Sequence, residues 1–259
     1  MNIQVKTMLE WKNEGVEPEI LFWVGSAGSF DDRSKKITRA FVKIMNKARV
    51  EFGVLGIEES ASGDTAKRAG NEFLFQIQAL TNIELMNSYN IKRIVTTCPH
   101  DFNTIKNEYK NLGGNYEVLH HTEFIYELIS EKRFKLNNNL KNHKITYHDP
   151  CYLGRGNNIF DIPRILLKEM GVKLIEMKRS KKQSFCCGAG GAQMFKEPEP
   201  GRQDININRT QEALKTNALT IATCCPFCNT MMTDGVKNIS EGSMDVLDIA
   251  EIIVKSENL

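Results

Sequence analysis

Cysteine is the residue type in this chain best suited to chemistry, and its seven copies lie at positions 98, 151, 186, 187, 224, 225 and 228. An odd number of thiols argues against a disulfide framework, and so do the first 19 residues, which carry four glutamates and no apolar leader. Isolated cysteines are usually buried structural thiols. The run Cys186-Cys187-Gly188 and the loop Cys225-Pro226-Phe227-Cys228 are instead typical of metal or cluster binding, or of redox chemistry.

The sequence also repeats itself. The stretch ILFWVGS at residues 20–26 matches ITYHDPC at 145–151, and IVTTCPHDFNT at 94–104 matches IATCCPFCNT at 221–230. The offset between equivalent positions changes only from 125 (26 to 151) to 128 (123 to 251). Such steady self-similarity predicts two copies of one structural unit.

Each copy alternates short apolar strands with helical stretches, which predicts an α/β fold with a small parallel sheet flanked by helices. A helix is expected over 37–48, where apolar residues recur at helical spacing, and a strand over 173–177. We expect a first module at residues 1–136, a polar linker at 137–144 and a second module at 145–259.

The cysteines of the second module are expected to meet, because ligands of open parallel sheets bind outside the carboxyl ends of the strands. Cys151 and Cys225 directly follow strand-like runs, and Cys186-Cys187 lies in a loop after a third. Together with Cys228 they make five thiols, one more than zinc or a cubane iron–sulfur cluster needs. The loop at 188–191 (Gly-Ala-Gly-Gly) would let backbone N–H groups approach a cluster, although a simple tight turn also explains it.

Two neighbours of these cysteines have open roles. His148 precedes Cys151 by three residues and is suited to donate a hydrogen bond or a proton near the cluster, but a buried histidine at a strand end is an equally good interpretation. Cys224 is interpreted as a core thiol beside the ligands rather than as one of them.

The first module lacks most of these thiols. Its equivalent positions hold Ser26, Ser60, Ala61, Cys98 and Asp101. Serine is a poor ligand for iron or zinc and alanine is none, so we expect a degenerate, empty site there. Cys98, His100 and Asp101 lie close in sequence, but this pattern has little specificity for a metal.

Composition and motifs exclude several other classes. The net charge of +2 gives no reason to expect nucleic acid as a partner. Apolar runs near the start fall far short of the roughly 20 residues of a membrane span, so we expect a cytoplasmic chain with no direct span. The sequence has no Walker loop, no Gly-x-Gly-x-x-Gly after a strand and no Gly-x-Ser-x-Gly.

The pattern Cys151, Cys186-Cys187-Gly188 and Cys225-x-x-Cys228 resembles the cysteine-rich CCG domain along the whole chain, since that domain commonly occurs twice. It is found in heterodisulfide reductase, in the iron–sulfur subunits of glycolate oxidase and anaerobic glycerol-3-phosphate dehydrogenase, and in a lactate utilisation protein. The resemblance implies one [4Fe-4S]-type cluster, cubane or non-cubane, on Cys151, Cys186, Cys187, Cys225 and Cys228. It further implies electron transfer between an acceptor and a partner flavoprotein dehydrogenase or ferredoxin-like iron–sulfur subunit.

The chain departs from the family pattern where related first modules carry cysteines and this one has Ser26, Ala61 and Asp101. It also lacks the cysteine run of built-in ferredoxin clusters. We therefore expect an oxidoreductase subunit that acts with partner chains, at the periphery of a membrane-bound complex if it is membrane-associated. Two alternatives stay open: a zinc-bearing scaffold or assembly protein, and a heterodisulfide-reductase-like thiol/disulfide reductase.

Overall fold

A computed structural model describes residues 4–197, 200–240 and 242–259, and these divide into two compact units, Met1–Phe134 and Lys135–Leu259. Each unit contains one sheet in which every strand pair is parallel. The expected α/β fold of two duplicated modules, each with a small parallel sheet flanked by helices, is confirmed. Among the described residues, no helix is both long and apolar enough to cross a membrane.

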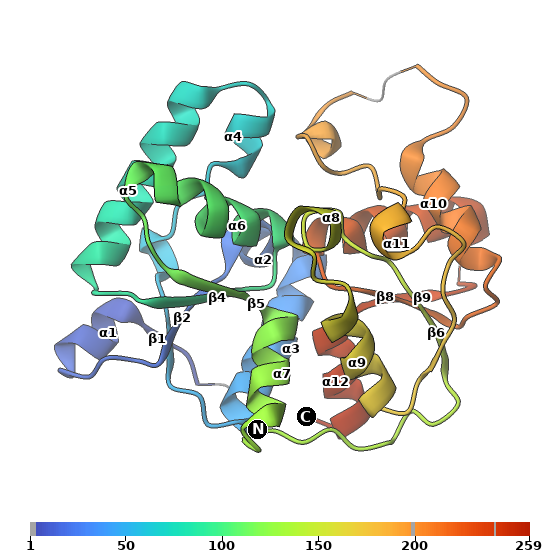
Figure 1. Ribbon diagram of the computed structural model, residues 1–259, viewed down its shortest axis with the longest axis horizontal. Helices are drawn as coiled ribbons and strands as arrows, with labels where there is room; N and C mark the ends of the chain where they lie inside the picture. Colours follow the sequence, from blue (N-terminus) through green and yellow to red (C-terminus); the bar gives the residue numbers. More distant parts are fainter. Residues whose placement is uncertain (1–3, 198–199, 241) are drawn as a thin grey trace. The chain divides into compact units, whose positions relative to one another are not determined.

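Unit 1 has the strand order β1-β3-β2-β4-β5. Helices α5 and α6 lie on one side of the sheet and α3 and α7 on the other (Figure 1). Its elements are β1 (Lys6–Thr7), α1 (Met8–Asn13), β2 (Ile20–Trp23), α2 (Gly25–Phe30), α3 (Asp32–Lys47), β3 (Phe52–Val54), η1 (Gly56–Glu58), α4 (Asp64–Arg68), α5 (Glu72–Ser88), β4 (Arg93–Thr96), α6 (Pro99–Asn103), the π-helical turn η2 (Thr104–Glu108), η3 (Tyr109–Leu112), β5 (Glu117–His120) and α7 (His121–Ser130).

Unit 2 has the strand order β7-β6-β8-β9, the same order as β3-β2-β4-β5 of unit 1. Helices α10 and α11 lie on one side of this sheet and α9 and α12 on the other (Figure 1). Its elements are β6 (Lys144–Tyr147), α8 (Gly154–Asn157), α9 (Asp161–Glu169), β7 (Lys173–Leu174), η4 (Lys181–Gln183), η5 (Gln193–Phe195), α10 (Ile205–Leu214), β8 (Thr220–Thr223), α11 (Pro226–Ser240), β9 (Asp245–Asp248) and α12 (Ile249–Glu257).

The sequence explains why these elements form. All four residues of β2 and of β8 are buried, as expected of central strands in a sheet covered on both faces. Helix α3 begins after Asp31, whose carboxylate accepts the backbone N–H of Ser34 at 2.7 Å as an N-cap. Apolar residues of α10, α11, β8 and β9 form one core cluster. This packing fixes the positions at which the strands of unit 2 end and the loops that follow them begin.

The structure adds details that sequence patterns did not indicate. β1 is a two-residue edge strand beside β3, too short and too polar to leave a periodic signal. β7 ends at Leu174, earlier than the expected strand over 173–177, and Glu176 turns instead to Arg164. Residues 137–144 are grouped with unit 2, where Asn137 and Asn139 hydrogen-bond Glu257 and Ser256 of α12.

Candidate metal centre

Three loops of unit 2 carry the cysteines, and each follows the carboxyl end of a neighbouring strand. Cys151 comes after β6, Cys186 and Cys187 lie between η4 and η5 after β7, and Cys225 comes after β8. Pro226 opens helix α11, a position that proline favours, and Cys228 lies in the first turn of that helix. The order of the strands brings the three loops to one edge of the sheet.

The five thiols form one continuous set of contacts. The Sγ atoms of Cys187 and Cys228 lie 3.3 Å apart. The thiol of Cys186 is hydrogen-bonded to those of Cys151 and Cys187, and that of Cys228 to those of Cys187 and Cys225. All seven cysteines of the chain are thiols rather than disulfides.

The surroundings of the thiols are apolar. Cys187, Cys225 and Cys228 are buried, whereas Cys151 and Cys186 are half-buried. Met194, Phe227 and Met231 pack around the buried three. This packing shields three of the five sulfurs from water, and the other two lie on the half-exposed side of the set of thiols.

Contacts between the thiols shift their pKa values in opposite directions. Hydrogen bonds from Cys151, Cys187 and the backbone N–H of Gly188 lower the pKa of Cys186 to about 2. Cys151 and Cys187 donate their thiol hydrogens to Cys186, and these hydrogen bonds raise the pKa of both donors. Five thiolates this close repel one another unless a cation compensates them. The donor set therefore fits a polynuclear metal group with sulfur ligands.

The glycine-rich loop contributes backbone as well as space. Gly188 has φ +96°, a conformation that side-chain-bearing residues rarely adopt, and its N–H donates to Cys186 Sγ at 3.2 Å. A Cβ at Gly188 would also lie 3.2 Å from Cβ of Ile205. The glycine is thus required for both the turn and the N–H···S contact.

His148 is fully enclosed beside the thiols. One of its ring nitrogens lies within 4.8 Å of the sulfurs of Cys187 and Cys228. Its Nδ1 accepts a hydrogen bond of 3.0 Å from Nε of Arg209 on α10. Burial and the charge of Arg209 lower the pKa of His148 to about 3, so the ring is neutral.

Buried ion pairs secure the loop after β6. Arg164 of α9 donates to both carboxylate oxygens of Asp149, at 2.7 and 2.9 Å, and also to Glu176. The backbone N–H of Lys181 donates to the same Asp149 carboxylate and so ties the second cysteine loop to the first. Sequence reasoning did not single out Arg164 or Arg209, because each meets its partner across a long sequence separation that no motif records.

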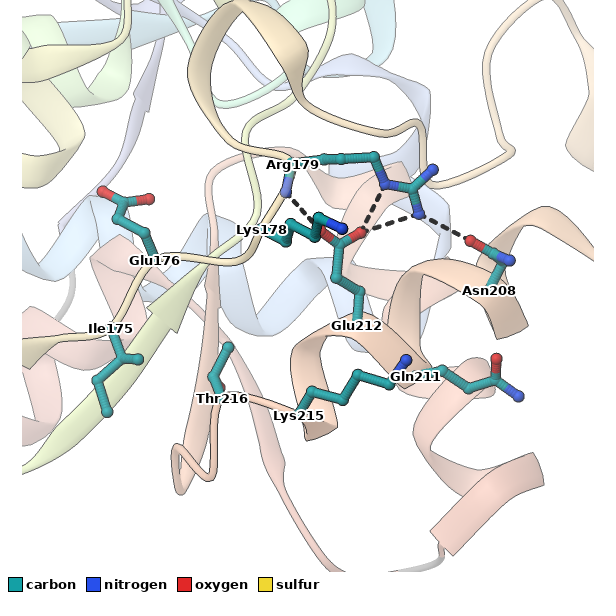
Figure 2. Close-up of a pocket in the computed structure, with 9 residues that line it drawn as sticks. All are labelled: Ile175, Glu176, Lys178, Arg179, Asn208, Gln211, Glu212, Lys215 and Thr216. Carbon is teal, nitrogen blue, oxygen red and sulfur yellow. Dashed lines mark hydrogen bonds and ion pairs between the residues drawn. The ribbon is translucent and has the colours of Figure 1, made fainter.

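Two residues that contact Arg209, namely Arg179 and Glu212, also line an open pocket of about 680 Å³ (Figure 2). Glu212 in its wall accepts from the backbone N–H and the guanidinium of Arg179, and Arg179 also donates to Asn208. Arg209 donates to Glu212 at 3.2 Å. Glu212 therefore links a solvent-facing arginine to a buried one.

The equivalent loops of unit 1 hold carboxylates and hydroxyls. Asp101 accepts from Ser62 Oγ at 2.5 Å and from the thiol of Cys98, and His100 Nδ1 lies 2.9 Å from Asp64. Within the described ranges, His148, Cys187 and Cys228 form the one group of His, Cys, Asp or Glu whose ligand atoms all lie within 4.8 Å of one another. Cys98, His100 and Asp101 do not form such a group.

Cys224 and two histidines of unit 1 lie in the cores of the two units. Cys224 is buried and its sulfur lies 2.8 Å from the hydroxyl of Tyr147. His120 and His121 are both buried, and Nδ1 of His120 lies 2.7 Å from Thr122 Oγ1.

Comparison with known proteins gives a family and several relatives. The family model described as cysteine-rich domain (CCG) matches residues 20–106 and 145–233. The chain is 46% identical over 98% of its length to the probable iron-sulfur-binding oxidoreductase FadF of Bacillus subtilis, covering 36% of that protein. It is also 46% identical over 94% of its length to the EtfAB:quinone oxidoreductase of Syntrophomonas wolfei, covering 35% of it.

A more distant relative is one of the subunits of the dihydromethanophenazine:CoB–CoM heterodisulfide reductase of Methanosarcina barkeri. The identity is 31%, over 98% of this chain and 64% of that archaeal protein. The chain thus spans about a third of the length of the two bacterial relatives and under two thirds of the archaeal one.

Proposed function

Because this chain belongs to the cysteine-rich CCG domain family, we propose that it is the iron–sulfur electron-transfer part of an oxidoreductase. The cluster is of the [4Fe-4S] type and is held by Cys151, Cys186, Cys187, Cys225 and Cys228. The observation that carries this proposal is the continuous, largely buried set of five thiols at the strand ends of unit 2.

The chain's own residues have separable tasks in this function. The cysteines bind the cluster as thiolates, and Met194, Phe227 and Met231 keep water from its buried side. The N–H of Gly188 donates to Cys186 Sγ. When bound, an iron–sulfur cluster supplies a one-electron carrier whose potential depends on burial and on hydrogen bonds to its sulfurs.

The name of one relative supports the proposed partners. This relative is called EtfAB:quinone oxidoreductase, and we propose an arrangement here in which the chain also acts between a protein partner and a quinone. Electrons come from a flavoprotein or a ferredoxin-like iron–sulfur unit and pass through the cluster to an acceptor. With a quinone as that acceptor, the chain lies at the cytoplasmic periphery of a membrane-bound complex.

The test is anaerobic purification of the chain, followed by iron, zinc and acid-labile sulfide analysis and an absorption spectrum of the same sample. We expect about four iron and four sulfide per chain and a brown chromophore. Cys187→Ser should lose most of the iron and the chromophore, since it removes a buried thiol in contact with Cys186 and Cys228.

Cys224→Ser is the matched control for this experiment. Cys224 is adjacent to Cys225, but its sulfur contacts the hydroxyl of Tyr147, and serine keeps a polar group there. This variant should retain the iron of the unmodified chain. One zinc per chain without sulfide, even after reconstitution with iron and sulfide, would move the protein to the zinc-scaffold class. A spectrum that changes on addition of a disulfide substrate would favour the thiol/disulfide reductase instead.

A further inference from the structure

Arg209 is a charged side chain with no exposure to solvent, and its donors are unevenly used. Nε donates to Nδ1 of His148 at 3.0 Å, and Nη1 donates to the carbonyl of Arg179 at 2.9 Å and to Glu212 at 3.2 Å. Nη2 is buried and has no hydrogen-bond partner in the described part of the chain. Burial of a charged group with an unpaired donor costs free energy, so Arg209 has a role beyond packing.

The contact with Arg209 determines where His148 carries its proton. A guanidinium has only N–H groups to offer and cannot accept a hydrogen bond. Nδ1 of His148 must therefore be the accepting, unprotonated nitrogen, and in the neutral ring the hydrogen is on Nε2. A hydrogen on Nδ1 would place two donors against each other at 3.0 Å.

The position of the ring gives this tautomer a consequence. A ring nitrogen of His148 lies within 4.8 Å of the sulfurs of Cys187 and Cys228, and Nε2 is the nitrogen that Arg209 leaves available. Judged by proximity alone, His148 would be the third ligand of a metal ion with these two cysteines. Ligation through Nε2, however, requires the hydrogen on Nδ1, where metal-bound histidines normally donate to an acceptor. Here the neighbour of Nδ1 is a donor.

We propose that Arg209 is a positioning residue that holds His148 with its hydrogen on Nε2, so that His148 donates to a sulfur of the cysteine cluster and does not ligate metal. The tautomer follows from this chain alone, whereas the identity of the metal group rests on the proposed function. Glu212 completes the arrangement, because its carboxylate balances the buried charge of Arg209 and is itself held by Arg179.

The proposal predicts an effect on reduction potential. A hydrogen bond to a cluster sulfur favours the more negative, reduced state and raises the potential. Removal of the Nε2–H donor should therefore make the cluster harder to reduce while leaving its five thiolate ligands in place. A ligand would behave differently, since its removal would lower the iron content.

The first experiment tests the tautomer without any metal. The reduced, metal-free full chain labelled with ¹⁵N-histidine is studied by NMR, with the His148 signals assigned by comparison with His148→Gln. We expect an unprotonated Nδ1 and a protonated Nε2 in the unmodified chain. A hydrogen on Nδ1 would overturn the proposal, and this readout does not depend on whether any variant folds.

Two arginine variants then test the cause of the tautomer. Arg209→Met removes the donor to Nδ1, so the signals should report mixed tautomers or a protonated ring. Arg133→Met is the matched control, because the guanidinium of Arg133 donates to Glu19 in unit 1 rather than to His148 or Glu212. It should leave the His148 tautomer unchanged. An unchanged tautomer in Arg209→Met as well would contradict the positioning role.

The second experiment measures the midpoint potential of the iron-loaded chain and of two His148 variants. His148→Leu removes both hydrogen bonds and should shift the potential to a more negative value at unchanged iron content. His148→Gln offers an oxygen to Arg209 and an N–H₂ group to the sulfurs, and should restore most of the shift. Equal potentials in all three proteins, or loss of iron in His148→Leu alone, would refute the donor role. A chain that takes up no iron at all would count against the proposed function and would leave the NMR result standing.

Discussion

Asp149 stands between His148 and Cys151, and its carboxylate receives two hydrogen bonds from Arg164. The side chains of both members are buried, with 2% and 5% of their surface exposed. Such a pair contributes little net stability relative to apolar residues, but loss of one member leaves the other as an uncompensated buried charge. Asp149 therefore affects both the stability of unit 2 and the placement of the first cysteine loop.

Asp149→Asn should lower the free energy of unfolding by about 3–5 kcal/mol, the range for breaking a buried pair. The lower end is expected, because Glu176 still pairs with Arg164. Denaturant unfolding of the reduced chain measures this change. The control is Asp161→Asn, which removes an ion pair with Lys181 whose side chains are 75% and 51% exposed, and this solvent-screened pair should contribute far less to stability. Equal effects of the two substitutions would contradict a supporting role for Asp149.

At the scale of elements, the same three loops differ between the units in what they carry. In unit 1, Glu59 follows η1 and accepts the backbone N–H groups of Val24 at 3.0 Å and Gly25 at 2.6 Å, at the start of α2. Burial, together with the nearby charge of Asp101, raises the pKa of Glu59 to about 8. A network of oxygens, hydrogen-bonded among themselves and to backbone, thus occupies the strand ends of unit 1.

The raised pKa of Glu59 predicts a pH-dependent stability. Its pKa is about 8 in the folded chain and 4.5 as the ordinary value, so the folded state binds the proton more tightly. The stability contributed by this proton is fully present below pH 4.5 and is lost as the pH rises through 8. Asp101, with a pKa of about 6, contributes in the same direction at lower pH.

Glu59→Gln isolates this contribution, because it removes the titration and adds a constant cost for one lost acceptor. The difference in unfolding free energy between Glu59→Gln and the unmodified chain should change in favour of the variant between pH 5 and pH 8.5. Chemical unfolding at several pH values measures it. A difference that stays constant over this range would show that Glu59 titrates normally in the folded chain.

The two parallel modules and the cysteine loops could be predicted from the sequence, because buried strands, helices and the repeat leave local patterns. The roles of Arg209 and Arg164 could not. Arg209 contacts His148, 61 residues away in the sequence, and Arg164 contacts Asp149, 15 residues away. Such contacts depend on how α9 and α10 pack on the sheet, and no spacing rule encodes them. His148 was noticed for its place before Cys151, but its proton position required the structure.

Over the whole molecule, one fold appears twice, and the two copies carry different side chains at the equivalent edge of each sheet. The shared strand order β3-β2-β4-β5 and β7-β6-β8-β9 makes the ends of β4 and β8 equivalent, and a cysteine follows each of them. Cys225 contacts the other thiols of unit 2, whereas Cys98 contacts the Asp101 carboxylate. The fold alone therefore does not bring thiols together, and the difference between the units lies in the residues that the three loops carry.

This equivalence provides a matched pair of substitutions within one chain. Cys225→Ser should remove most of the iron, since it takes a fully buried thiol from the set of five. Cys98→Ser should leave the iron unchanged, because serine still offers a hydroxyl to the Asp101 carboxylate that Cys98 contacts. Iron and sulfide analysis of the two variants beside the unmodified chain checks both expectations. An unmodified chain with about eight iron, half of them lost in Cys98→Ser, would mean that unit 1 holds a second cluster despite Ser26 and Ala61.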